Sequence, residues 1–340
     1  MAKKETELKN NAAQLEFVKK VKEMVPSSHS FVDELADLLQ VSNDSAYRRI
    51  RGETALSIDE VVLLCNHYRI SFDSFSKQHR GSVTFNCNSL DNQDKSLENY
   101  LNKILTDLKQ IQSFEQKEII YAAEDVPIFH NFAFPELTAF KLFYWNRSML
   151  DVPSLEGKKF DFSVVSKEFV SLVKEIFNTY ITIPSIEIWT EETVSSLLKQ
   201  VQFYWDSGIF QNKKDALLVC DQIQQMLTQI EKQAAAGSKI LEKRSAQYDN
   251  NFTLYNSELM IGNNTILVSM GNIKVSYLSY HSFNSMTTTN VNFCNDSENW
   301  LKNLVRKSTL ISGVSEKQRY QFFRKKQDVV KELLEHIAGK

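Results

Sequence analysis

Glycine and proline are scarce in this 340-residue chain, which contains 9 and 5 of them. The glycine-rich patterns GxGxxG and GxxxxGK[ST], which let a backbone approach a phosphate closely, do not occur. The cysteines are widely scattered, and no two have the CxxC spacing of a metal or redox site. These four are Cys65, Cys87, Cys220 and Cys294. We therefore expect no metal site, no cofactor and no disulfide framework, which fits a reducing cytoplasm.

The chain also lacks an excess of charge of one sign and a long apolar run. Its formal net charge is -2, so any affinity for nucleic acid must come from a local basic patch. The N-terminal stretch MAKKETELKNNAAQLEF has no apolar segment typical of a signal peptide. No apolar run approaches the length of a membrane span. We expect a cytoplasmic protein that does not contact a membrane.

Patterns of catalytic residues are missing as well. The six histidines show neither HExxH nor another paired ligand spacing. Ser308 and Ser312 do not lie in a GxSxG motif. His130 lies among phenylalanines, where a lone histidine is more often a hydrogen-bonded core residue than a ligand. We expect that the protein is not an enzyme; a cavity in residues 97–340 with converging acidic and histidine side chains would reopen that alternative.

The residues that are abundant favour helices. Leucine, lysine, glutamate and glutamine are frequent, and apolar residues recur at intervals of three and four. Short β-branched and aromatic segments follow Asn251, separated by the turn signals Gly262-Asn263-Asn264 and Gly271-Asn272. We therefore predict a mainly α protein with a small antiparallel β-sheet over about 252–294. The helices expected outside the first 80 residues span about 96–111, 163–180, 190–206, 212–234 and 298–306, followed by an amphipathic C-terminal helix over 315–337.

The chain divides into three parts by composition. A polar stretch, KQHRGSVTFNCNSLDNQDK, separates two regions with helical periodicity. We predict a domain of short helices over 1–80, a linker over 81–96 and a mostly helical sensing or dimerisation domain over 97–340.

The first part contains four to five short helices with clear end signals. Ser30 and Ser42 are good N-caps, and Gly52 can end the helix that begins near Asp44. Ser57 and Glu60 have the spacing of a capping box. The helix that begins near Asp44 carries three arginines in the segment YRRIR, residues 47–51.

Residues 12–76 resemble the phage-repressor (Xre/Cro-like) helix-turn-helix family. The resemblance lies in the apolar pattern of residues 35–39, the Val41-Ser42 turn and the ending ISFDSF over residues 70–75. Gln40 stands where that family often has glycine. The resemblance implies a recognition helix that enters the major groove of double-stranded DNA.

The expected recognition helix has one apolar and one polar face. Ala46 and Ile50 are four residues apart and would face Leu35 and Leu38. Exposed residues at the start of such a helix reach base edges, and later ones reach phosphates. The predicted DNA-binding residues are Ser42, Asn43, Asp44, Ser45, Tyr47, Arg48, Arg49 and Arg51.

Within this set each residue has an expected role. Asn43 can read adenine and Arg48 can read guanine by paired hydrogen bonds. Arg49 and Arg51 are expected to contact phosphates. Ser42, together with the free backbone amides at the start of the helix, can also bind a phosphate. Asp44 would repel phosphate unless it caps the helix or accepts from cytosine. A solvated helix face, or a helix-turn-helix that binds protein, is the alternative.

Two features of the larger part are ambiguous. Aromatic residues between Phe129 and Trp145 predict either a packed core or a pocket for a small-molecule or peptide effector. The candidate ligand-binding residues are Tyr144, Trp145, Asn146 and Arg147. The C-terminal helix either docks on its own domain or pairs with a second subunit; we expect a homodimer, because one module buries too little DNA for tight binding. The sequence thus predicts a bacterial-type, sequence-specific transcriptional regulator, and the alternative is a protein-interaction scaffold.

Overall fold

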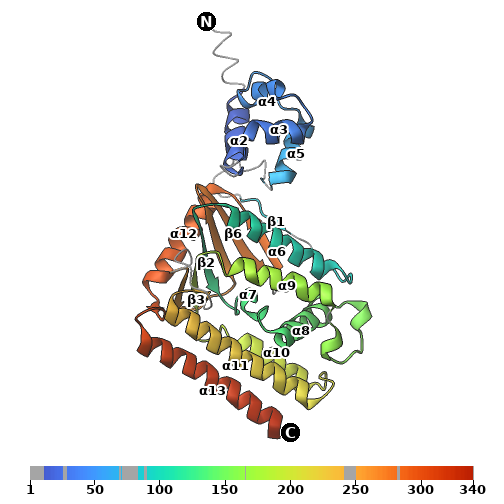
Figure 1. Cartoon of the computed structure of the whole chain (residues 1–340), viewed down its shortest axis with the longest axis vertical. Helices are drawn as coiled ribbons and strands as arrows, with labels where there is room; N and C mark the ends of the chain where they lie inside the picture. Colours follow the sequence, from blue (N-terminus) through green and yellow to red (C-terminus); the bar gives the residue numbers. More distant parts are fainter. Residues whose placement is uncertain are drawn as a thin grey trace.

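The N-terminal helices form one group at an end of the molecule (Figure 1). The computed structural model describes residues 11–25, 29–68, 70, 83–87, 90–164, 166–240, 250–281 and 284–339. The group contains α2 (Ala12–Glu23), α3 (Phe31–Leu39), α4 (Asn43–Ile50) and α5 (Ile58–Tyr68). Most of the ISFDSF ending lies outside the described residues. The predicted domain boundaries at 80 and 96 stay predictions.

The predicted helix ends in this region are confirmed. The Ser30 hydroxyl accepts from the Asp33 amide at 3.5 Å, and that of Ser42 accepts from the Ser45 amide at 3.3 Å. Ser57 and Glu60 form the reciprocal capping box, with distances of 2.8 and 3.1 Å. Gly52 has a φ of 71° after α4. Gln40 adopts the left-handed conformation after α3, with a φ of 53°, at the position where the resembled family often has glycine.

The larger part is built on an eight-stranded mixed sheet. Its strand order is β1-β7-β6-β5-β2-β3-β4-β8. The central strands β2, β3 and β4 run parallel, and the remaining neighbours pair antiparallel. The strands are β1 (Asn86–Cys87), β2 (Lys117–Ala123), β3 (Ser185–Trp189), β4 (Phe252–Asn256), β5 (Thr265–Met270), β6 (Ile273–Tyr280), β7 (Asn284–Thr288) and β8 (Thr309–Leu310).

The predicted fold class, mainly α with a small antiparallel sheet over 252–294, is therefore wrong. The apolar runs in the central strands KEIIYAA and SIEIW are too short for their periodicity to distinguish a strand from a helix. They are covered on both faces, so they lack the alternation of a half-exposed strand. Gly271-Asn272 does form the turn between β5 and β6. The segment with Gly262 does not form a hairpin turn. It connects β4 to β5, which are not neighbours in the sheet, because β4 lies between β3 and β8.

Helices cover both faces of this sheet (Figure 1). Residues alternate along the strands, so Ile120 and Ile188 pack toward Leu301 of α12, whereas Ile119 and Tyr121 belong to the larger core on the other face. That larger core contains residues of every other long helix. The helices are α6 (Ser96–Ser113), α7 (Ile128–Asn131), α8 (Pro135–Tyr144), α9 (Lys167–Tyr180), α10 (Ser195–Asp206), α11 (Lys213–Ala236), α12 (Val291–Arg306) and α13 (Glu316–Gly339), with a π-helical turn over Trp145–Met149 and short 3-10 turns over Pro153–Leu155 and Phe162–Val164.

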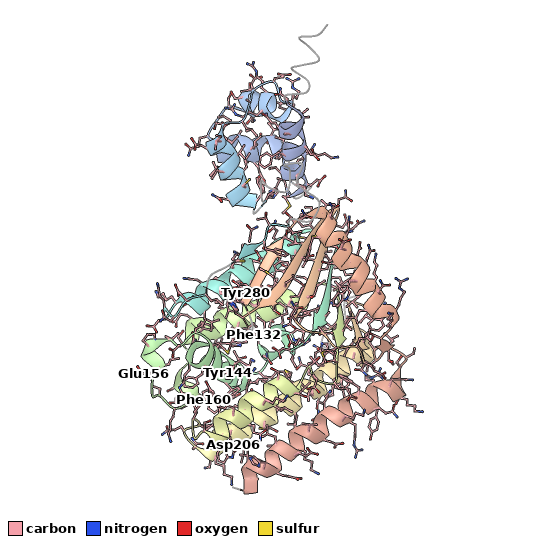
Figure 2. The ribbon with its side chains drawn as sticks, turned by 180° about the vertical axis from the view of Figure 1, so that it is seen from behind. Phe132, Tyr144, Glu156, Phe160, Asp206 and Tyr280 are labelled. Atoms are coloured by element: carbon pink, nitrogen blue, oxygen red, sulfur yellow. The ribbon has the colours of Figure 1, made fainter. Side chains whose placement is uncertain are left out.

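The C-terminal helix α13 lies alongside α11 (Figures 1 and 2). Its apolar face, which includes Phe322, Phe323, Val330 and Ile337, is buried against other residues of the same chain. This settles where that face packs, and the homodimer stays a prediction. In the described part of the chain, the helices are too short or too polar to span a bilayer.

Candidate functional site

Helix α4 presents a polar face to solvent and packs through its other face. Ala46 is completely buried, and Ile50 is half-buried against the core that includes Leu35. On the outer face, Tyr47 is 51% exposed. The side chains of Arg48 and Arg51 are 55% and 58% exposed. The sequence therefore placed these three residues correctly on an accessible face.

Arg49 does not belong to that exposed face. Its guanidinium contacts the Glu60 carboxylate of α5 at 2.8 and 3.0 Å and donates to the Ser45 carbonyl at 3.3 Å. Burial alone would raise the pKa of Glu60, but the hydrogen bonds from Arg49 and Ser57 hold it below its ordinary value. Arg49 thus links α4 to α5 in this structure, and its predicted phosphate contact stays a prediction.

The remaining predicted residues lie around the start of α4. Ser42 is the N-cap, so Asp44 does not cap the helix and is exposed in its first turn. The Asn43 amide donates to Asp33 of α3 at 2.8 Å. Ser45 contacts the Ser42 hydroxyl at 3.1 Å. The N-terminal end of α4 is therefore ordered by its own side chains and remains accessible.

Glu53 neutralises part of the exposed basic surface. Its carboxylate lies 3.2 Å from Nε of Arg51 and 4.0 Å from Nε of Arg48. The Arg51 guanidinium also lies 5.7 Å from the centre of the Tyr47 ring. All of these groups are solvent-exposed, so their ion pairs are worth only about 0–1 kcal/mol.

The four predicted effector residues do not converge on one site. Trp145 is buried and lines a cavity, whereas Tyr144 lines a separate, more open pocket. The Asn146 amide donates to the Leu142 carbonyl at 3.1 Å, and Arg147 lies 5.9 Å from the centre of the Tyr204 ring. The helix-to-π-helix transition at Trp145 directs these consecutive side chains to different surroundings.

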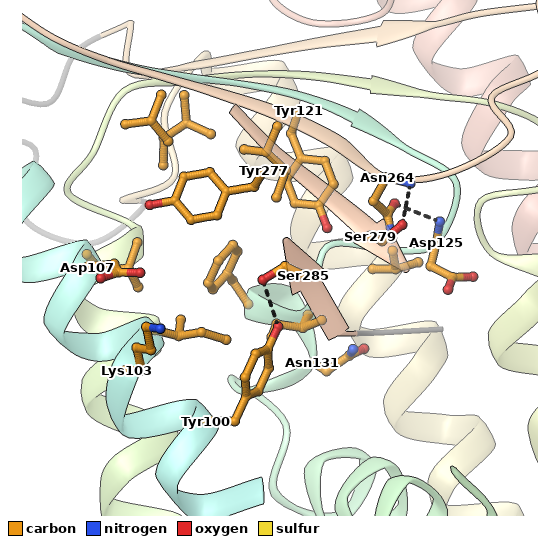
Figure 3. A pocket seen from close by; sticks show the side chains of 18 of the residues that line it. Tyr100, Lys103, Asp107, Tyr121, Asp125, Asn131, Asn264, Tyr277, Ser279 and Ser285 are labelled. Atoms are coloured by element: carbon orange, nitrogen blue, oxygen red, sulfur yellow. Dashed lines mark hydrogen bonds between the residues drawn. The ribbon is translucent and has the colours of Figure 1, made fainter. Parts of the chain in front are cut away.

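The cavity lies between α6 and the face of the sheet formed by β2, β5, β6 and β7 (Figure 3). Its volume is about 120 Å³. Tyr121 and Tyr277 line it from the sheet, and Tyr100 lines it from α6 with its hydroxyl 3.3 Å from the Ser285 hydroxyl. Much of the remaining wall is apolar: Ile104, Leu108, Ile111, Ile119, Val126, Ile128, Phe129, Ile266 and Val268.

Charged and polar groups also reach this cavity. Lys141 of α8 is buried, donates to the Gln200 carboxamide at 2.7 Å and lies 4.9 Å from the centre of the Trp145 ring. Burial lowers the pKa of Lys141 to about 8, and the negative charge of Asp125 partly opposes that shift. Asn264 accepts from the backbone amides of Glu124 and Asp125 at 2.8 and 3.3 Å, which fixes the segment after β2.

A second polar cluster lies in the packed core. The Glu187 carboxylate accepts from Trp189 Nε1 at 2.9 Å, contacts His130 Nε2 at 2.9 Å and accepts from the Tyr180 hydroxyl. Burial raises the pKa of Glu187, but its hydrogen-bonded partners and the charge of Lys239 bring the pKa below its ordinary value. None of these five side chains lines the cavity. His130 is thus a hydrogen-bonded core residue, and the single signal for Glu187 in the sequence was an acid within the apolar strand SIEIW.

Among the described residues, no group of three or more histidine, cysteine or acidic side chains is arranged to hold a metal ion. Comparison with protein families, curated proteins and solved structures found no match to this chain. The surface of α4 and the cavity beneath α6 are therefore the two candidate sites that its own residues provide.

Proposed function

We propose that the protein binds specific sites on double-stranded DNA through α4 and regulates transcription. The observation that carries this proposal is the exposed face of a short, capped helix that bears Tyr47, Arg48 and Arg51 and rests on α3 through Ala46. Two helices joined by a short turn, with a basic second helix, match the way a helix-turn-helix reads the major groove.

The positions along α4 divide the contacts. Arg48 can donate two parallel hydrogen bonds to the major-groove edge of guanine, which gives sequence specificity. Arg51, one residue beyond the helix, suits a phosphate, as does the Ser42 end where the amides of the first turn are available. Asn43 can reach adenine when its hydrogen bond to Asp33 is exchanged for one to the base.

Glu53 does not oppose this function strongly. Its ion pairs with Arg48 and Arg51 are exposed, so a phosphate can replace the carboxylate at little cost. The exchange leaves Glu53 near the backbone of the DNA, where it limits affinity for non-specific sequences. We further propose a cytoplasmic, bacterial-type regulator that acts as a homodimer, because one recognition helix buries too little DNA for tight binding.

A protein-interaction scaffold is the second candidate function, and one observation favours it. Ile58, Val62 and Leu63 on α5 are 82%, 51% and 42% exposed. Exposed apolar side chains grouped on one helix can contact a protein partner. A scaffold of this kind would have no affinity for DNA, which makes the two functions distinguishable.

A salt titration with duplex DNA tests the proposal. We expect the association constant, measured by fluorescence anisotropy with the full-length protein, to fall steeply as salt rises, because phosphate contacts release counterions. Arg51→Ala should reduce the slope of log K against log salt by about one. The matched control is Arg324→Ala on α13, which removes another exposed arginine whose partner is an acid, Asp328.

Two results would contradict the proposal. The first is no measurable DNA binding at low salt by a protein whose circular dichroism shows a folded state. The second is an equal decrease in the slope of log K against log salt in the Arg51→Ala and Arg324→Ala variants. That result would mean that the affinity for DNA depends on the overall charge of the protein and not on the surface of α4.

A further inference from the structure

The cavity beneath α6 is lined by two opposite charges, Lys141 and Asp125. The negative charge of Asp125 acts on Lys141, but no ion pair within contact distance joins the two among the described residues. The Lys141 ammonium has a neutral carboxamide as its hydrogen-bond partner. The half-buried Asp125 carboxylate makes no hydrogen bond or ion pair within the part of the chain that the structure describes. A buried charge without a counter-charge is costly, so an anion beside Lys141 would be stabilising.

The same wall holds a hydrogen-bond acceptor without a partner. Asn131 is 1% exposed, and its side-chain carbonyl oxygen is buried without a hydrogen bond. Such an acceptor is destabilising when it is left unpaired, because it has lost its hydrogen bonds to water. A ligand that supplies an N–H donor would remove this cost. An anion would therefore stabilise Lys141, and one cationic N–H donor would serve both Asn131 and Asp125.

The remaining charges that line the cavity balance. Lys103 and Asp107 lie one turn apart on α6, on the side opposite Asp125 and Asn264 (Figure 3). The cavity thus has two groups of each sign and no net charge. A ligand with only one charge would face both an attractive and a repulsive group, whereas a ligand with one charge of each sign can complement both.

The apolar part of the cavity sets the size of the ligand. A volume of about 120 Å³ is near that of an engineered apolar cavity of about 150 Å³ that takes up benzene. Leu108, Ile111 and Phe129 enclose this part. It accommodates a branched aliphatic or aromatic side chain.

We propose that this cavity binds a small zwitterion of the α-amino-acid type with an apolar side chain. Lys141 would hold its carboxylate, Asp125 and the Asn131 carbonyl would hold its ammonium group, and the apolar wall would enclose its side chain. Asp125, Gln200 and Ser279 also line the adjacent open pocket, so the charged end of the ligand lies toward the entrance. The binding site does not depend on DNA binding, and its test involves no DNA.

Calorimetry with three matched probes tests the charge requirement. L-phenylalanine carries both charged groups, 3-phenylpropanoate lacks the ammonium group, and 2-phenylethylamine lacks the carboxylate. We expect saturable binding of L-phenylalanine or L-leucine to the full-length protein, with one ligand per chain. Each single-charge analogue should bind at least about tenfold more weakly, because it leaves one buried group without a partner.

Two variants assign the charges. Lys141→Met should weaken L-phenylalanine at least about tenfold but should not weaken 2-phenylethylamine, which has no carboxylate for Lys141 to hold and is repelled by its charge. Asp125→Asn should weaken L-phenylalanine but should not weaken 3-phenylpropanoate, which has no ammonium group for Asp125 to hold. Lys158→Gln, at an exposed position outside the cavity, is the control and should bind as the wild type does.

The wild-type measurements decide the proposal even if a variant does not fold. It is overturned if either single-charge analogue binds as tightly as L-phenylalanine. It is equally overturned if neither L-phenylalanine nor L-leucine shows saturable binding up to its solubility limit.

Discussion

Individual residues show where the sequence was informative and where it was not. The caps at Ser30, Ser42 and Ser57 are local hydrogen bonds within four residues, so the sequence alone predicted them. The pairing of Arg49 with Glu60 joins two helices, and no local pattern distinguishes it from the exposed Arg48 and Arg51. Lys141 was missed for a related reason, since a lysine in a helix is almost always exposed unless tertiary packing encloses it.

The buried Lys141 makes a prediction about pH. Its pKa is about 8 in the folded protein and near the ordinary 10.5 in the unfolded chain. Between these values the unfolded chain binds more protons, so the free energy of unfolding should rise with pH. The contribution of Lys141 is on the order of 3 kcal/mol over that window. Burial also lowers the pKa of Lys239, to about 7, which acts in the same direction.

Urea unfolding of the wild type and of Lys141→Met at several pH values between about 7 and 10 measures this contribution. Burial raises the pKa of the Cys220 thiol, which opposes this rise at alkaline pH in both proteins. We therefore expect the difference in the free energy of unfolding between wild type and variant to shift in favour of the wild type as the pH rises. The control Lys158→Gln should follow the wild type. Identical pH profiles for wild type and Lys141→Met would show that Lys141 is not desolvated as the structure places it.

At the scale of secondary-structure elements, most helices were predictable and the sheet was not. The helices over 167–180, 195–206 and 213–236 agree with the periodicity of their apolar residues to within a few positions. β2 and β3 are short and pair with strands more than 60 positions away along the chain, so nothing in their local sequence identifies the partner. This sheet forms one wall of the cavity, so the residues that line the cavity could not be predicted without the strand order.

Helix α13 provides the element-scale prediction. Phe323 is completely buried, whereas Val329 on the same helix is 45% exposed. Phe323→Ala should lower the free energy of unfolding by about 3–5 kcal/mol, because it leaves a cavity in the core. Val329→Ala should change it by less than about 0.5 kcal/mol. Chemical denaturation compares the two, and a similar small effect of both changes would mean that α13 does not pack on its own chain.

For the whole molecule, one described segment lies beside a strand that lines the cavity. The segment that follows the N-terminal helices contains β1, which pairs with β7 through Asn86 and Thr287. The Thr288 hydroxyl also donates to the Thr84 carbonyl at 2.8 Å. Thr287 and Ser285 of β7 line the cavity. A ligand that displaces β7 would therefore act directly on residues 83–87, which lie within or next to the predicted linker.

The central claim is that α4 reads specific DNA, and selection of bound duplexes from a random-sequence library tests it most directly. With the full-length protein, we predict enrichment of a two-fold symmetric sequence that contains a guanine in each half-site. Arg48→Ala should abolish that enrichment while its circular dichroism stays that of the wild type, and Arg324→Ala should retain it. The absence of any enriched sequence with the wild type, or the same enriched sequence with Arg48→Ala, would contradict the account.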